Sequence, residues 1–147
     1  MLRIKSYTHL DIYSAATDTS LSLPYVDTGI RAGFPSPADD FYHLSIDLNK
    51  ELIKNKESTF FARVKGDSMR DAGIDDGDLL VIDRSLEPQN GKIAVCFIDG
   101  EFTVKRIKIE GDAVWLIPGN QNYSPIRVTG ENRFIIWGIV TSVIKFL

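Results

Sequence analysis

The chain has 147 residues, of which 44% are hydrophobic and 25% charged, a composition typical of one soluble globular domain with room for an arm. Its formal net charge of −3 argues against autonomous DNA binding, which normally requires a basic surface. No apolar run approaches the roughly 20 residues of a membrane span, and no signal-peptide pattern opens the chain, so we expect a cytoplasmic protein. The single cysteine, Cys96, excludes an intrachain disulfide.

Residues 1–40 predict an extended, weakly structured arm. Three of the six prolines and two glycines fall within fourteen positions, Pro24, Gly29, Gly33, Pro35 and Pro37. Such a density of helix breakers prevents a regular helix over this stretch. A short helix is expected with Pro37 in its first turn and Ser36 or Asp39 as its cap, and one or two helical turns over residues 46–53, with Asp47 near their start.

From residue 59 onward the sequence predicts a mostly β fold. Short apolar or alternating runs, separated by turn residues at intervals of about 8–12 positions, indicate several strands. These runs are residues 60–65, 79–83, 92–98, 101–109, 114–118 and 134–144. Asp99-Gly100 between two of them is a strong hairpin signal. We therefore expect a small β-rich domain over residues 41–147, preceded by the arm.

The sequence offers no pattern for a metal or a cofactor. Two histidines, His9 and His43, and one cysteine do not make a zinc set. The acidic run of Asp71, Asp75, Asp76 and Asp78 lacks the ligand spacing of a calcium-binding loop. Glycine-rich nucleotide-binding loops are also missing from the sequence.

The stretch Gly66-Asp67-Ser68-Met69 directly follows a predicted strand. A serine in such a turn exposes its hydroxyl, and successive backbone N–H groups can converge on one oxyanion. A serine nucleophile needs a base, and Lys105 in the strand over 101–109 can serve if burial keeps its amine neutral. Taken singly, an ordinary turn serine and a solvated strand lysine are the simpler interpretations.

The arm itself offers a substrate. Ala32-Gly33 has small residues on both sides of one peptide bond, in a segment that the prolines keep out of a helix. A nucleophile can approach such a bond closely. The sequence thus contains a possible enzyme and a possible substrate in one chain.

These features together resemble the UmuD-type branch of the LexA-like self-cleaving serine peptidases, including its plasmid-borne MucA- and RumA-like members. The matching stretches are GFPSPADD (33–40), IDLN (46–49), GDSM (66–69), GIDDGDLL (73–80), DGEFTVKR (99–106) and YSPI (123–126). They extend over most of the chain from residue 31, whereas the first thirty residues match poorly. Ala32 stands where the chromosomal UmuD prototype has cysteine, a change between two small residues.

The resemblance implies a LexA/UmuD-like fold and a Ser-Lys dyad. Ser68 would be the nucleophile, Lys105 the general base, Ala32-Gly33 the scissile bond, and the backbone N–H groups of Asp67 and Ser68 the oxyanion donors. Self-cleavage would be stimulated by a RecA filament on single-stranded DNA during the SOS response. The shortened homodimer would then join a UmuC-like Y-family polymerase in error-prone translesion synthesis. No metal or cofactor is implied.

Alternative functions remain open from the sequence. A LexA-like repressor requires a DNA-recognition domain, which the 32 residues before the bond do not accommodate, so we expect no sequence-specific DNA binding. A signal-peptidase-like enzyme requires a membrane anchor. A non-catalytic protein-interaction module would make the serine and lysine coincidental.

Overall fold

The computed structural model describes residues 3–6, 9–17, 20, 22–25 and 44–147. The chain divides into two compact units, one of residues 1–15 with 55–147 and one of residues 16–54. The bond Ala32–Gly33 and the helix predicted after Pro37 lie outside the described residues. No helix among the described residues is long and apolar enough to span a membrane.

The smaller unit contains a two-stranded sheet and one short helix. Strand β3 (Ser22–Tyr25) pairs antiparallel with β4 (Leu44–Asp47), and helix α1 (Leu48–Leu52) follows directly. Asp47 caps this helix, because its Oδ1 accepts a hydrogen bond of 3.0 Å from the backbone N–H of Asn49. The helical turn predicted over 46–53 is confirmed, whereas β3 and β4 were not predicted.

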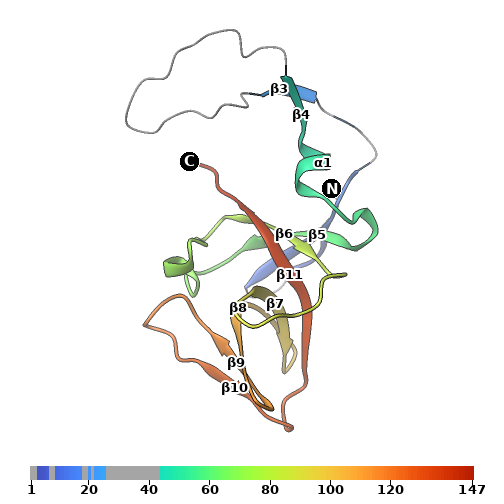
Figure 1. The fold of residues 1–147 in the computed structure, drawn as a ribbon. Coiled ribbons are helices and arrows are strands. Elements are labelled where there is room, and N and C mark those ends of the chain that lie inside the picture. Colours follow the sequence, from blue (N-terminus) through green and yellow to red (C-terminus); the bar gives the residue numbers. More distant parts are fainter. Residues whose placement is uncertain (1–2, 7–8, 18–19, 21, 26–43) are drawn as a thin grey trace. The chain divides into compact units, whose positions relative to one another are not determined.

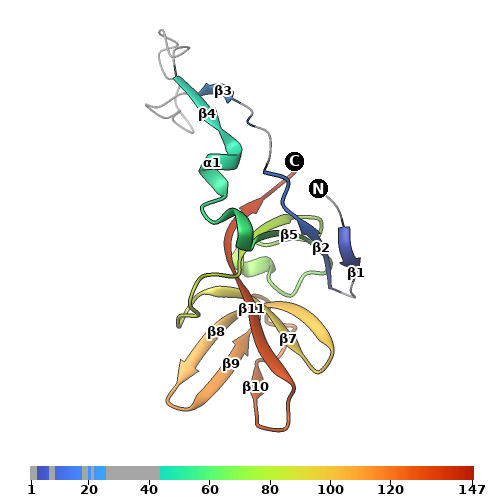
Figure 2. The same cartoon turned by 90° about the vertical axis from the view of Figure 1, so that its right-hand side faces the viewer.

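The larger unit is built on one sheet of nine strands among the described residues, and every pairing in it is antiparallel. The order across the sheet is β1-β2-β5-β6-β11-β7-β8-β9-β10 (Figures 1 and 2). The strands are β1 (Arg3–Ser6), β2 (Leu10–Ser14), β5 (Thr59–Val64), β6 (Leu79–Asp83), β7 (Ile93–Ile98), β8 (Glu101–Glu110), β9 (Ala113–Ile117), β10 (Ile126–Val128) and β11 (Phe134–Ile144). Two short 3₁₀ turns are η1 (Lys56–Ser58) and η2 (Arg70–Ala72). The prediction of a mostly β fold is confirmed.

The hairpin between β7 and β8 turns at the predicted dipeptide. Asp99 has φ 48° and Gly100 has φ 85°, so both residues lie in the left-handed region that a tight two-residue hairpin requires. This turn fixes the register of the two strands and places Lys105 opposite Ala94.

Strand β11 lies between β6 and β7 and pairs with both (Figure 2). The pairing register of β11 shifts between Ile136 and Gly138 and between Val140 and Ser142. Such shifts are typical of β-bulges. A Cβ on Gly138 would lie 2.5 Å from Ile82 Cγ2, so only glycine lets β11 pass β6 this closely. β11, the last predicted strand, thus joins the half of the sheet from β1 to β6 with the half from β7 to β10.

Two clusters of buried side chains form the core of this unit. One contains Leu10, Ile82 and Val95, and the other contains Cys96, Ile107 and Leu116. Four aromatic rings, those of Phe60, Phe97, Phe102 and Trp137, meet edge to face beside the first cluster.

The arm expected over residues 1–40 contains three strands in its described part. β2 buries Leu10 and Ile12 in the core and pairs with β5, and β1 pairs with β2. β3 pairs with β4 in the smaller unit. The division into a cleavable arm over 1–40 and a peptidase domain over 41–147 stays a prediction.

Candidate active site

Ser68 lies in the turn that follows β5. The strand ends at Val64, and Gly66 with φ 98° reverses the chain, a conformation that side chains other than glycine rarely adopt. The backbone N–H of Gly66 donates to Asp76 Oδ1 at 2.8 Å, which fixes the start of the turn. Ser68 itself is partly exposed.

Lys105 reaches this serine from β8, on the other half of the sheet. The residue is 5% exposed. Its Nζ donates hydrogen bonds to Ser68 Oγ at 3.0 Å, to Thr103 Oγ1 at 2.7 Å and to the Val104 carbonyl at 3.0 Å. Thr103 therefore orients the amine from the same face of the same strand, two residues away.

Burial lowers the pKa of Lys105 to about 8. A charged Cys96 thiolate would raise it again, but burial raises the pKa of Cys96 to about 12. The thiol is therefore neutral near pH 8 and does not offset the desolvation of the amine. Among the described residues, no carboxylate lies within ion-pair distance of Lys105 Nζ. The lysine thus has an accessible neutral form close to physiological pH.

A groove of about 260 Å³ opens beside the serine and the lysine. Its apolar walls come from Ile98, Tyr123 and Ile126, and Ser68, Thr103 and Lys105 form its polar part. Its lining also includes the charged or polar residues His9, Lys65, Asp67, Glu101 and Ser124. Such a groove can accommodate an extended peptide with small or apolar side chains.

The loop after β9 fixes the serine turn from a second side. Gly119 N–H donates to the Ser68 carbonyl at 2.8 Å, and Asn120 Nδ2 donates to the Asp67 carbonyl at 3.0 Å. Tyr123 Oη donates to Asp67 Oδ1 at 2.7 Å, and this hydrogen bond raises the pKa of the phenol. Sequence reasoning missed these contacts, although the YSPI stretch had drawn attention to Tyr123.

The structure brings some of the predicted site residues together. Ser68 and Lys105 lie in hydrogen-bond contact, and within the described part of the chain the backbone N–H groups of Asp67 and Ser68 have no hydrogen-bond acceptor. Ala32 and Gly33 lie outside the described residues, as does His43. Among the described residues, no group of three His, Cys, Asp or Glu side chains lies close enough together to hold a metal ion.

The sequence is similar to those of known proteins. The family model of the peptidase S24-like proteins matches residues 24–141. The chain belongs to the peptidase S24-like family. It is 42% identical to protein ImpA of Escherichia coli over 127 residues, which is 86% of each chain. It is also 37% identical to protein MucA of Escherichia coli over 134 residues, 90% of this chain and 91% of MucA.

A more distant relative is the LexA repressor of Acidithiobacillus ferrooxidans. It is 36% identical over 145 residues, which cover 97% of this chain and 70% of the repressor. Membership of the S24-like family and the similarity to ImpA and MucA identify a self-cleaving serine peptidase of the LexA/UmuD type that functions in SOS mutagenesis and translesion synthesis. The repressor alternative has less support than this function.

Proposed function

We propose that Ser68 and Lys105 are the catalytic dyad and that they cleave the bond Ala32–Gly33 of the same protein. The observation that carries this proposal is the 3.0 Å contact between Lys105 Nζ and Ser68 Oγ inside a groove. Burial of the lysine supports the role of base, because a neutral amine can accept the serine proton.

In the proposed reaction, neutral Lys105 takes the hydroxyl proton while Ser68 Oγ attacks the carbonyl carbon of Ala32. The tetrahedral intermediate collapses, the C–N bond breaks, and Lys105 returns the proton to the amine of Gly33. Water, deprotonated by the same lysine, then hydrolyses the acyl-ester on Ser68. The products are the fragment that ends at Ala32 and the chain that begins at Gly33.

The backbone N–H groups of Asp67 and Ser68 are our proposed oxyanion donors. Both lie in the turn that carries the nucleophile, and neither has another acceptor among the described residues. Two such donors bind the negatively charged oxygen of the intermediate more strongly than the neutral carbonyl oxygen of the substrate.

For the partners, we propose a cytoplasmic homodimer whose cleavage is accelerated by RecA on single-stranded DNA. RecA would favour the conformation with the arm in the groove and would donate no catalytic group. The shortened protein would then assemble with a UmuC-like Y-family polymerase. The similarity to ImpA and MucA supports this context.

The test is incubation of the purified full-length protein with RecA, ATP and single-stranded DNA, followed by mass spectrometry of the products. We expect one new chain that begins at Gly33. Ser68→Ala should remain intact while folding normally, because removal of one partly exposed hydroxyl changes stability little. Ser142→Ala, which removes a serine hydroxyl on β11 that does not line the groove, is the matched control and should still cleave. A Gly33 fragment from Ser68→Ala would contradict the assignment of the nucleophile.

A further inference from the structure

The turn Asp75-Asp76-Gly77-Asp78 supports the start of the serine turn. Asp76 Oδ1 accepts the Gly66 N–H at 2.8 Å. The Val64 N–H donates to the Asp78 carbonyl, and the Gly77 N–H donates to the Val64 carbonyl, both at 2.9 Å. The acidic turn therefore lies directly beside the end of β5. It thus holds Gly66, two residues before Ser68, by a direct hydrogen bond.

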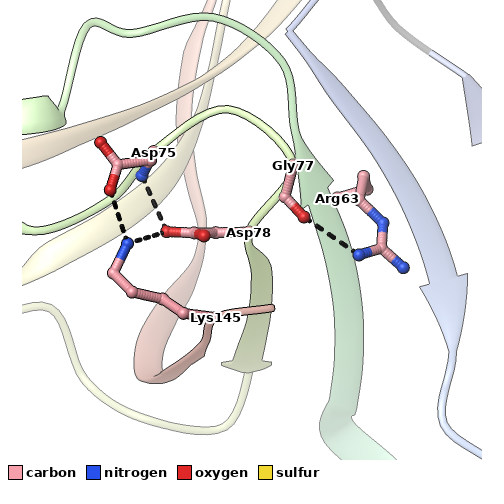
Figure 3. A network of polar contacts seen from close by, with 5 residues as sticks. All are labelled: Arg63, Asp75, Gly77, Asp78 and Lys145. Atoms are coloured by element: carbon pink, nitrogen blue, oxygen red, sulfur yellow. Dashed lines mark hydrogen bonds and ion pairs between the residues drawn. The ribbon is translucent and has the colours of Figure 1, made fainter. Parts of the chain in front are cut away.

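Lys145, just after β11, holds the opposite side of the acidic turn (Figure 3). Its Nζ lies 2.8 Å from Asp75 Oδ2 and also contacts Asp78 Oδ2. Asp78 is only 5% exposed, and its Oδ2 additionally accepts the Asp75 N–H at 2.8 Å. A buried carboxylate beside a second carboxylate needs a cation, and Lys145 supplies it. The two carboxylates in turn raise the pKa of Lys145.

A second contact joins the same parts of the chain. Arg63 Nη1 donates to the Gly77 carbonyl at 3.0 Å, as Figure 3 shows. The Arg63 guanidinium also lies 5.4 Å from the centre of the Phe146 ring. The residues after β11 and the acidic turn are thus connected through β5 as well as through Lys145.

We propose that Lys145 is a positioning residue for self-cleavage, which acts through the Asp75–Asp78 turn and the Asp76–Gly66 hydrogen bond to hold Ser68 Oγ against Lys105. This inference rests on the proposed function. It gives the dyad a positioning residue just after β11, more than seventy residues from the serine in sequence. Without the cation, the acidic turn separates, Gly66 loses its fixed acceptor, and the serine turn relaxes.

The experiment measures self-cleavage of the full-length protein in alkaline buffer without RecA. Lys145→Met should cleave about tenfold more slowly, because a nucleophile displaced by even a fraction of an ångström loses reactivity steeply. Lys145→Arg should stay within about twofold of the unaltered protein, since arginine also bridges two carboxylates. Lys108→Met, which removes an exposed lysine paired with Glu110, is the control of equal charge and should cleave normally.

Two further measurements separate positioning from general destabilisation. Hydrogen exchange of the Gly66 amide, followed by NMR in the Ser68→Ala background, should be faster in Lys145→Met and unchanged in Lys108→Met. Asp76→Ala removes the hydrogen bond to the Gly66 N–H and leaves the contacts of Lys145 with Asp75 and Asp78 intact. It should slow cleavage, and adding Lys145→Met to it should slow cleavage little further, because both act through one contact.

The possible failures are distinct. If the unaltered protein and Lys108→Met both fail to cleave even after RecA, ATP and single-stranded DNA are added, the proposed function is wrong. If they cleave and folded Lys145→Met cleaves at the same rate, the role of Lys145 is wrong. Equal Gly66 exchange in both lysine variants, or fully additive effects of Asp76→Ala and Lys145→Met, would also overturn it.

Discussion

Lys105 is buried without a counter-ion among the described residues. Its amine contacts a serine hydroxyl, a threonine hydroxyl and a backbone carbonyl, all of them uncharged. Oxygen acceptors of this kind orient the amine and compensate only part of the lost hydration of its charged form. The same burial that makes the lysine costly to the fold therefore makes it a better base.

The rate of self-cleavage should follow the deprotonation of Lys105. The pKa of about 8 predicts a rate that rises with pH and levels off above a midpoint near that value. The measurement is the first-order rate of fragment formation in buffers from pH 6 to pH 10. Lys105→Arg, whose side chain stays protonated throughout, should not cleave at any of these values. A rate independent of pH would contradict the role of base.

The sequence predicted the two residues that meet at the groove but only part of what surrounds them. Ser68 stood out because a glycine turn follows a strand, and Lys105 because no histidine was a suitable base. The contacts of Asn120 and Tyr123 with Asp67 span more than fifty residues and depend on how the loop after β9 folds back. No local pattern encodes such a contact.

Among the elements, the strands with strong local signals were predicted to within about one residue. β6, β7, β8 and β11 are apolar or alternating runs ended by turn residues. β10 has only three residues and follows Pro125, so it has no period to detect. β3 contains Pro24, which argues against a strand, and a two-stranded sheet accepts it because both strands are edges. β1 and β2 are short, and β2 depends on its pairing with β5 and β1 on its pairing with β2.

The loop after β9 packs so closely on the serine turn that a side chain at Gly119 would have to displace its neighbours. An added Cβ would lie 3.0 Å from Ala72 Cβ and 3.2 Å from Met69 Cα. Gly119→Ala should therefore lower the free energy of unfolding by about 1–3 kcal/mol and slow self-cleavage, because the loop must move away from Ser68. Urea denaturation and the cleavage rate measure the two effects.

Gly130→Ala is the matched control for that substitution. A Cβ at Gly130 meets no atom within 4 Å, and Gly130 does not line the groove beside Ser68. We expect its stability and cleavage rate to stay close to those of the unaltered protein. Equal effects at both glycines would show that the close packing of Gly119 has no special importance.

At the scale of the whole molecule, the buried lysine reduces stability at neutral pH. Its pKa is about 8 in the folded chain and 10.5 when it is solvated. Below pH 8 the folded state carries the full cost of the buried charge. Between about pH 8 and pH 10.5 the unfolded chain binds more protons, so this group makes the free energy of unfolding rise with pH.

Lys105→Met should consequently stabilise the protein at pH 7, by on the order of 1–3 kcal/mol. The gain should shrink toward zero as the pH approaches 10.5, where the lysine is neutral in both states. Urea denaturation of Ser68→Ala with and without Lys105→Met, at pH 7 and pH 10, measures the difference without interference from cleavage. A gain of the same size at both pH values would show that packing, and not the charge, is responsible.

The position of β11 has a consequence for the timing of synthesis. Ser68 follows β5, Lys105 lies on β8, and the sheet connects their two halves through β11, the last described strand in the sequence. A ribosome completes the proposed nucleophile and its proposed base well before it completes the strand that joins the two halves of the sheet. The growing polypeptide therefore carries both groups without a continuous sheet to align them, and on the proposed assignment self-cleavage cannot begin until residues 134–144 have emerged.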